Sequence, residues 1–428
     1  MLREPIHLGP ARALPILLGG YAFIMIHFVL SRALRDTLLG SKLSVDSLPG
    51  LTFKGTLLAV ALSVVLPLVL QWSKRIHLIR AIYLLNGLIE IAMVVLEHRH
   101  PMIYSFYYIG VSASTAIGVS LMWMLIGDWA SSTHANKARS IPRIMLFGTA
   151  ASMVTGFGLV RLLSHATFAN TCLALAMTNI GAATLMLFYK DEACKPCRSP
   201  IEVVARGTTY LEHRLVRSLA LVTIAGAVVS TLLDLLFRVK LAEHFTTMSD
   251  RLHFMGMFQG ALSFAAAVSQ LLVTRVATTK LGVKAIRLHP LCVIAGSAMA
   301  AVLPLFAVIA SLRIGEYSMR NSFFRFGSEM SYSSLPDKLR VEVRPIIDVV
   351  GERTGDAIAA GLLQLLIVFA PGIQTRAALL TLSCCSFVLF GLGVLLGDRT
   401  HSVEDAGMSM ENLDGTLHGV AREGAILS

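Results

Sequence analysis

Charged side chains are scarce in this sequence: Asp, Glu, Lys and Arg account for only 15% of its 428 residues, whereas 55% are hydrophobic. A soluble domain carries about 25% charged residues. The mean hydropathy of +0.69 is high for the same reason. This composition excludes an ordinary soluble domain and predicts an all-α integral membrane protein that crosses the lipid bilayer many times.

Motifs for catalysis and metal binding are equally scarce. No GxxxxGK[ST] loop is present, which excludes a P-loop motor. The one CxxC motif, Cys194 to Cys197, has only His213 nearby, whereas a structural zinc site needs four ligands. The other cysteines fall in apolar runs and suit packing. We therefore expect neither an enzyme nor a bound cofactor or metal ion.

Twelve stretches are apolar enough for membrane spans, which need about 20 residues each. They cover residues 13–34, 51–71, 78–96, 101–127, 143–163, 167–189, 215–239, 253–274, 288–310, 312–332, 346–370 and 375–396. The tenth is the weakest, because five charged residues interrupt it: Arg313, Glu316, Arg320, Arg325 and Glu329. The first is too long for the apolar core of a signal peptide, so we expect it to be a retained span.

The net charge of +11 does not indicate a nucleic-acid partner. Lysine and arginine gather in alternate connections, at residues 74–80, 137–143, 190–214, 275–287 and 338–344. Loops of this kind face the cytoplasm in membrane proteins. We therefore expect both termini on the cytoplasmic side of a bacterial inner membrane, with a disordered tail at 398–428.

An internal repeat divides the chain. The run Leu51–Gly55 has a counterpart in Leu252–Gly256, 201 residues later, and Ser131-Ser132 has one in Ser333-Ser334, 202 residues later. Two parallel six-span halves are the plan of the major facilitator fold. We therefore predict twelve transmembrane helices in two six-helix halves, 1–189 and 215–397, with a cytoplasmic linker at 190–214.

Charged residues in or beside the spans are the candidate site residues, because a charge within the membrane is costly. Arg32, Arg35 and Asp36 end the first span, where arginine also commonly reaches to the membrane interface. Lys54 begins the second span, and its counterpart in the repeat is the apolar Met255. Lys54 is therefore a candidate phosphate ligand, with anchoring at the membrane surface as the alternative.

Asp234 and Arg238 in the seventh span lie four residues apart on one helix face. They form either a permanent ion pair or a pair that separates when substrate binds, and Lys240 follows as a supporting cation. Glu90 lies deepest in an apolar run. It is a candidate proton-coupling carboxylate, with pairing to a buried arginine as the alternative.

Between Arg320 and Gly355 the sequence resembles the ATP/ADP translocases of plastids and obligate intracellular bacteria. The most specific similarity is Asp348-Val349-Val350-Gly351 followed by Arg353. Similar residues elsewhere are Arg32, Arg35, Asp36, Leu233, Asp234, Arg238, Lys240, Phe254, Met255, Gly256 and Arg344. Two departures are Ala33, where that family has Asp, and Asp356, where it has Lys.

The resemblance implies a carrier that exchanges nucleotides or another phosphorylated anion. A triphosphate brings about four negative charges into a site of low dielectric constant, so several fixed cations must meet it. The candidate substrate-binding residues are Arg32, Arg35, Lys54, Asp234, Arg238, Arg344 and Arg353. The candidate gating or supporting residues are Asp36, Lys240, Asp348 and Glu352.

Two alternatives stay open. One is a proton-coupled facilitator for another organic anion or metabolite, for which Glu90 is the best feature. The absence from the fourth span of a glutamate that the translocases carry favours it. The other is a membrane sensor that binds a ligand without transporting it, which the short loops disfavour.

Overall fold

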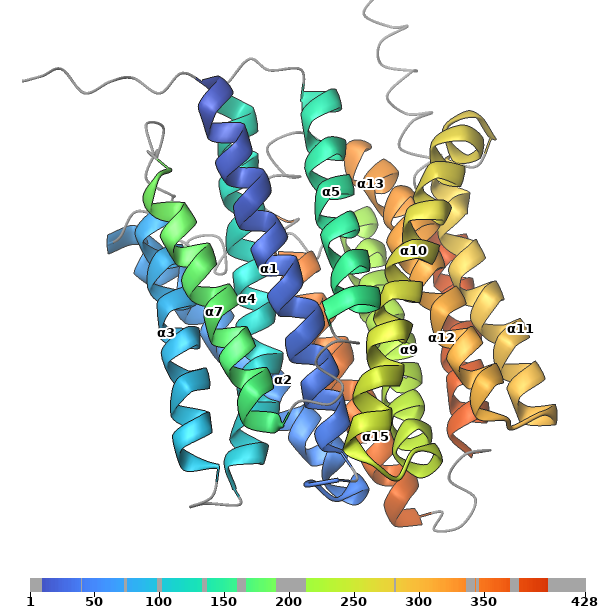
Figure 1. Cartoon of the computed structure of the whole chain (residues 1–428). Coiled ribbons are helices and arrows are strands. Elements are labelled where there is room, and N and C mark those ends of the chain that lie inside the picture. The colour runs from blue at the N-terminus through green and yellow to red at the C-terminus, as the bar shows by residue number, and fades with distance from the viewer. Residues whose placement is uncertain are drawn as a thin grey trace, which may run out of the picture.

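The protein is a bundle of long helices (Figure 1). A computed structural model describes residues 10–39, 41–72, 75–97, 102–132, 137–159, 167–189, 213–280, 282–335, 343, 346–369 and 377–398. Within these ranges the regular structure is helical, apart from one isolated bridge between Leu39 and Leu43. Residues 190–212 of the predicted linker lie outside the described residues, as does the predicted tail after residue 398.

The N-terminal half contributes six helical rods. They are α1 (Pro10–Leu38), α2 (Leu48–Trp72), α3 (Arg75–Leu96), α4 (Ile103–Ser132), α5 (Lys137–Val154) with its π-helical continuation η2 (Thr155–Leu159), and α7 (Phe168–Leu187). A 3-10 turn, η1 (Val45–Ser47), precedes α2. Each predicted span of this half falls on one of these rods.

The C-terminal half begins with α9 (Arg214–His244), α10 (Met248–Lys280), the 3-10 turn η3 (Gly282–Arg287) and α11 (Leu288–Val302). It continues with α12 (Phe306–Met319), η4 (Arg320–Phe324), α13 (Arg325–Ser333), η5 (Ile346–Gly351), α15 (Glu352–Phe369) and a last helix, Ala377–Asp398. In the described part of the chain, nine helices are long and apolar enough to cross a membrane.

One span boundary is misplaced in the sequence prediction. Residues 288–310 and 312–332 imply a break near residue 311, but the chain turns at Leu303–Leu305. Pro304, at the centre of this turn, has no backbone N–H and so cannot continue a helix interior. The charges that weakened the tenth span do not interrupt it, because α12, η4 and α13 continue one another without a gap.

The two halves meet along several helices. Figure 1 shows the blue-to-green helices on one side and the yellow-to-red helices on the other, with α5 beside α10 at the junction. Gly156 makes this contact possible, because a Cβ atom there would lie 2.4 Å from the backbone nitrogen of Gly260. Elsewhere on the junction, α2 packs against α15 and α1 packs against α10.

The outside of this bundle is apolar. Many large hydrophobic side chains are more than half exposed, among them Leu88, Met177, Leu271, Leu380 and Phe387. Soluble proteins rarely expose apolar surface on this scale, whereas a lipid-facing surface requires it. The chain is therefore a multi-pass membrane protein.

The structure places the ends of α1 and α9 on the same side of the bundle. The Arg251 guanidinium, near the start of α10, donates to the backbone oxygens of Leu39 (2.5 Å) and Ala242 (3.0 Å). If the termini are cytoplasmic, as the sequence predicts, this side faces outward.

We expect Glu243→Cys, in a protein whose six native cysteines are replaced, to react with an impermeant thiol reagent added outside. Lys284→Cys, in η3, should stay unlabelled, and the reverse pattern would contradict the predicted orientation.

Candidate functional site

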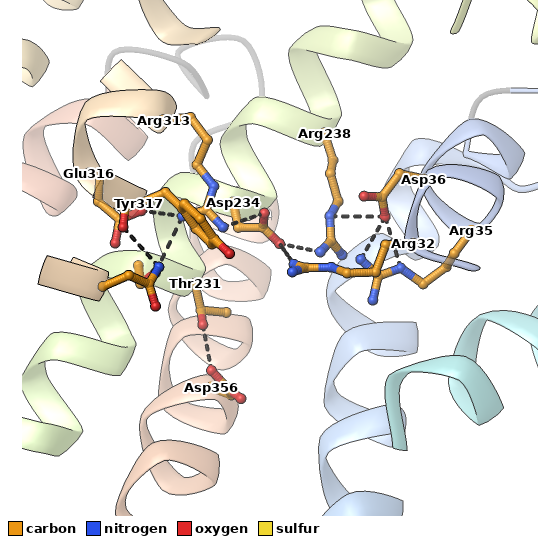
Figure 2. Close-up of polar contacts among 12 residues, drawn as sticks. Arg32, Arg35, Asp36, Thr231, Asp234, Arg238, Arg313, Glu316, Tyr317 and Asp356 are labelled. Carbon is orange, nitrogen blue, oxygen red and sulfur yellow. Dashed lines mark hydrogen bonds and ion pairs between the residues drawn. The ribbon is translucent and has the colours of Figure 1, made fainter. Parts of the chain in front are cut away.

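A cluster of arginines and carboxylates lies between the two halves (Figure 2). We call it the arginine cluster, and it consists of Arg32, Arg35 and Asp36 from α1, Asp234 and Arg238 from α9, and Arg313 and Glu316 from α12. Most of its members are buried, and the most accessible are Arg32 and Asp234, whose side chains are 20% and 16% exposed. The structure thus brings together five of the sequence-predicted residues.

Asp234 is the centre of the cluster. It pairs with Arg238 one turn later on α9, as the spacing predicts. Its other oxygen accepts from Arg313 of α12 at 2.9 Å. Arg32 of the N-terminal half approaches Asp234 only to 3.9 Å. One carboxylate therefore meets three guanidinium groups, and Arg32 is the most loosely held of the three.

Asp36 forms the second bridge between the halves. It accepts from Arg35, its neighbour on α1, at 2.8 Å, and lies 3.3 Å from the Arg238 Nε of α9. Arg238 also donates to the Tyr108 hydroxyl of α4 at 2.7 Å. The Arg35 guanidinium stacks over the Tyr108 ring, 5.3 Å from its centroid. Arg35 and Arg238 are thus each held by more than one contact when no anion is bound.

The sequence analysis missed Arg313 and Glu316, which it treated only as interruptions of a weak span. They pair with each other on α12, and Glu316 also contacts the ring of His289 on α11 at 3.1 Å. All three side chains are at most 7% exposed. The signal was present, because the two charges lie three residues apart in an apolar run, as Asp234 and Arg238 lie four apart.

The candidates of α15 pair within the C-terminal half. Arg353 donates to Asp356 (2.8 Å), and Glu352 accepts from Arg320 (2.6 Å). Asp348 accepts from the Tyr332 hydroxyl at 2.8 Å. These contacts join α15 and η5 to η4 and α13 of the same half, and a gating role for Asp348 and Glu352 stays a prediction. Arg344 lies outside the described residues.

Two other candidates lie away from the arginine cluster. Lys54 is exposed on α2, on the same face as the exposed Phe53, Leu57 and Leu58. In the part of the chain that the structure describes, Lys54 forms no ion pair. Lys240 pairs at 2.5 Å with the half-exposed Glu243, three residues on. A phosphate contact for Lys54 therefore stays a prediction, in a location that also suits an anchor among lipid head groups.

Glu90 is buried inside the N-terminal half. The sequence analysis left open that a buried arginine pairs with Glu90, but its partners among the described residues are different. Glu90 contacts the His27 ring of α1 at 2.8 Å and accepts from the Asn179 amide of α7 at 2.8 Å. The site has no part in the arginine cluster.

The arginine cluster is suited to bind an anion. Its four guanidinium groups face three carboxylates, which leaves one positive charge in excess. An anionic ligand can replace Asp234 as the partner of Arg32 without leaving a buried charge uncompensated. Among the described residues no three His, Cys, Asp or Glu side chains gather in a way that would hold a metal ion.

Comparisons with known proteins identify the fold. No family model matches the sequence, and no curated protein matches it. Solved structures do match, at low identity. A bacterial homologue of the human lysosomal transporter Spinster, inward-facing and unoccupied, has a TM-score of 0.65 at 12% identity, over 93% of this chain and 99% of that one.

Two further structures agree. The nucleoside transporter NupG has a TM-score of 0.64 at 11% identity, over 91% of this chain and 98% of that one. The POT family transporter PepTSo has 0.65 at 9% identity, over 92% and 98%. The chain therefore has the predicted all-α, major facilitator-like membrane fold. The resemblance to ATP/ADP translocases finds no counterpart among these matches and stays a prediction.

Proposed function

We propose that this protein is a transporter that moves a phosphorylated anion, of the ATP or ADP type, across the membrane by alternating access. The observation that carries the proposal is the arginine cluster at the junction of the two halves. In the major facilitator plan the substrate lies near the bilayer midplane between the halves. The cluster occupies that junction and joins α1 of one half to α9 and α12 of the other.

The charge of the site favours a phosphorylated substrate. Guanidinium groups present planar pairs of donors that match phosphate oxygens, and they stay charged when buried. A neutral or cationic substrate would gain nothing from an excess of buried positive charge.

The contacts between the halves suggest how binding and movement are linked. Two contacts, Asp234 with Arg32 and Asp36 with Arg238, join the halves at 3.9 Å and 3.3 Å. An anion that takes over Arg32 removes the weaker of them. This lowers the cost of separating the halves at the cluster, where the Asp36–Arg238 and Arg238–Tyr108 contacts remain to be broken, and Asp234 takes Arg32 back after the anion is released. This exchange of partners favours obligatory exchange of one anion for another.

A second candidate, a proton-coupled facilitator for another organic anion, is favoured by the buried pair of His27 and Glu90. A membrane sensor is the third, and it would bind an anion without flux. Uptake of radiolabelled ATP into proteoliposomes separates them. Dependence on nucleotide inside the vesicles indicates exchange, uptake that a pH gradient drives without internal nucleotide indicates symport, and binding without uptake indicates a sensor.

Arg32→Gln should weaken ATP binding by about 1.5 to 3 kcal/mol, which is about 10- to 150-fold, because the variant loses a charge-assisted hydrogen bond. Isothermal titration in detergent measures the change. Lys42→Gln, which removes an exposed cation just after α1, is the matched control and should bind normally.

Lys54→Gln decides between the two roles of Lys54. As a predicted phosphate ligand, Lys54 should show a loss equal to that of Arg32→Gln, and normal binding would instead show that it is an anchor at the membrane surface.

A further inference from the structure

The N-terminal half contains a second buried ionisable site, the His27–Glu90 pair. His27 lies on α1, Glu90 on α3 and their partner Asn179 on α7, so three helices converge there. Both carboxylate oxygens are used: one lies 2.8 Å from the imidazole Nε2 and the other accepts from the Asn179 amide at 2.8 Å. His27 and Glu90 are each 4% exposed and Asn179 is fully buried.

This pair differs from the buried His–Glu pair of the C-terminal half. There, Glu316 contacts His289 and is also paired with the permanent cation Arg313. Glu90 has an imidazole and an amide instead, and no lysine or arginine contacts it in the part of the chain that the structure describes. An uncompensated buried carboxylate is costly. The one neutralising charge that His27 and Glu90 can acquire is a proton.

The groups around the pair connect it to the arginine cluster. Tyr107 of α4 and Cys172 of α7 lie within electrostatic range of Glu90, and both are buried. Tyr107 also lies within electrostatic range of Arg35 and Asp36. Its hydroxyl has no hydrogen-bond partner among the described residues although only 2% of the residue is exposed.

Two further charges bear on this region. Glu97, just after α3, lies within electrostatic range of the Cys172 thiol. Arg32, on the same helix as His27 and five residues on, belongs to the arginine cluster. Tyr107 thus lies within electrostatic range of both the pair and the cluster, and His27 shares α1 with Arg32.

We propose that His27 and Glu90 bind one exchangeable proton and couple its movement to that of the anion. A proton taken from water on one side converts the carboxylate and neutral imidazole, with one net negative charge, into a pair with no net charge. The proton leaves to water on the other side after the halves rock. Binding of the proton is independent of the proposed function, whereas the coupling rests on it.

Infrared difference spectroscopy tests proton binding without any substrate. Spectra of the protein in liposomes are recorded between acidic and alkaline pH. We expect the wild type to show carboxyl and imidazole bands that disappear in Glu90→Gln and weaken in His27→Gln. Glu97→Gln, just after the same helix, is the matched control and should keep these bands. Identical difference spectra for wild type and Glu90→Gln would overturn the proposal, whatever the transport assays show.

Uptake of radiolabelled ATP under an imposed pH gradient tests coupling. The wild type and Glu97→Gln should accumulate ATP according to the direction of the gradient. Glu90→Gln should exchange ATP for internal ATP but ignore the gradient. Wild-type exchange that ignores the gradient would overturn the coupling and leave the proposed function intact. Absence of any wild-type ATP movement would instead count against the proposed function, with the infrared result still deciding whether the pair binds a proton.

Discussion

Arg313→Gln should destabilise the protein by about 3 to 5 kcal/mol, the usual cost of removing one partner from a buried ion pair. Arg313 compensates two carboxylates at once, since it pairs with Glu316 and donates to Asp234 at 2.9 Å. Without it, the His289 ring is the remaining contact of Glu316 in the part of the chain that the structure describes. Thermal unfolding of the purified protein in detergent, followed by tryptophan fluorescence, measures the loss.

Two variants make this test specific. Arg325→Gln removes an arginine from the same helical rod, but its side chain is 58% exposed, so we expect a change of at most about 1 kcal/mol. Arg313→Gln combined with Glu316→Gln removes both charges of the α12 pair and should recover part of the stability. If Arg313→Gln unfolds at the same temperature as Arg325→Gln, Arg313 does not form the buried ion pairs that the structure gives it.

Much of the fold was readable from the sequence because its signals are local. Twelve apolar runs predict twelve helical rods, and the 202-residue repeat predicts two halves. The sequence prediction placed the break near residue 311, whereas the chain turns at Leu303–Leu305. Within a bundle a charge does not end a helix if partners on other helices compensate it, whereas Pro304 does end one because its backbone donor is missing.

The site was only partly readable. Asp234 with Arg238 was found because both partners lie on one helix, so their spacing predicts the contact. Glu90 with His27, and Asp234 with Arg313, join helices through residues that are 63 and 79 positions apart in sequence. No periodicity in a single sequence predicts which faces of two distant helices meet. For Lys54 the sequence leaves two roles open, because its position in the repeat does not say whether it meets substrate or lipid head groups, and its exposure on α2 is compatible with both.

The pair Asp234 and Arg238 gives the sharpest test of the proposed mechanism. Asp234→Asn should be strongly destabilising, by about 3 to 5 kcal/mol, because Arg238, Arg313 and Arg32 share this one carboxylate. Adding Arg238→Gln removes one positive charge and restores the balance of the cluster, in which Asp36 still pairs with Arg35. We therefore expect the double variant to recover most of the wild-type stability.

Transport separates the two roles that the pair can have. In the first role, Arg238 is needed to bind the anion after it leaves Asp234. In that case the double variant is stable but does not exchange ATP in proteoliposomes, because the arginine that should bind the substrate has been removed. We expect this outcome. Glu243→Gln, further along α9 and 52% exposed at the side chain, is the control for loss of a carboxylate and should remain stable and active. Full ATP exchange by the stable double variant would show that Asp234 and Arg238 serve folding alone, and the anion would then have to bind through Arg32 and Arg313 without them.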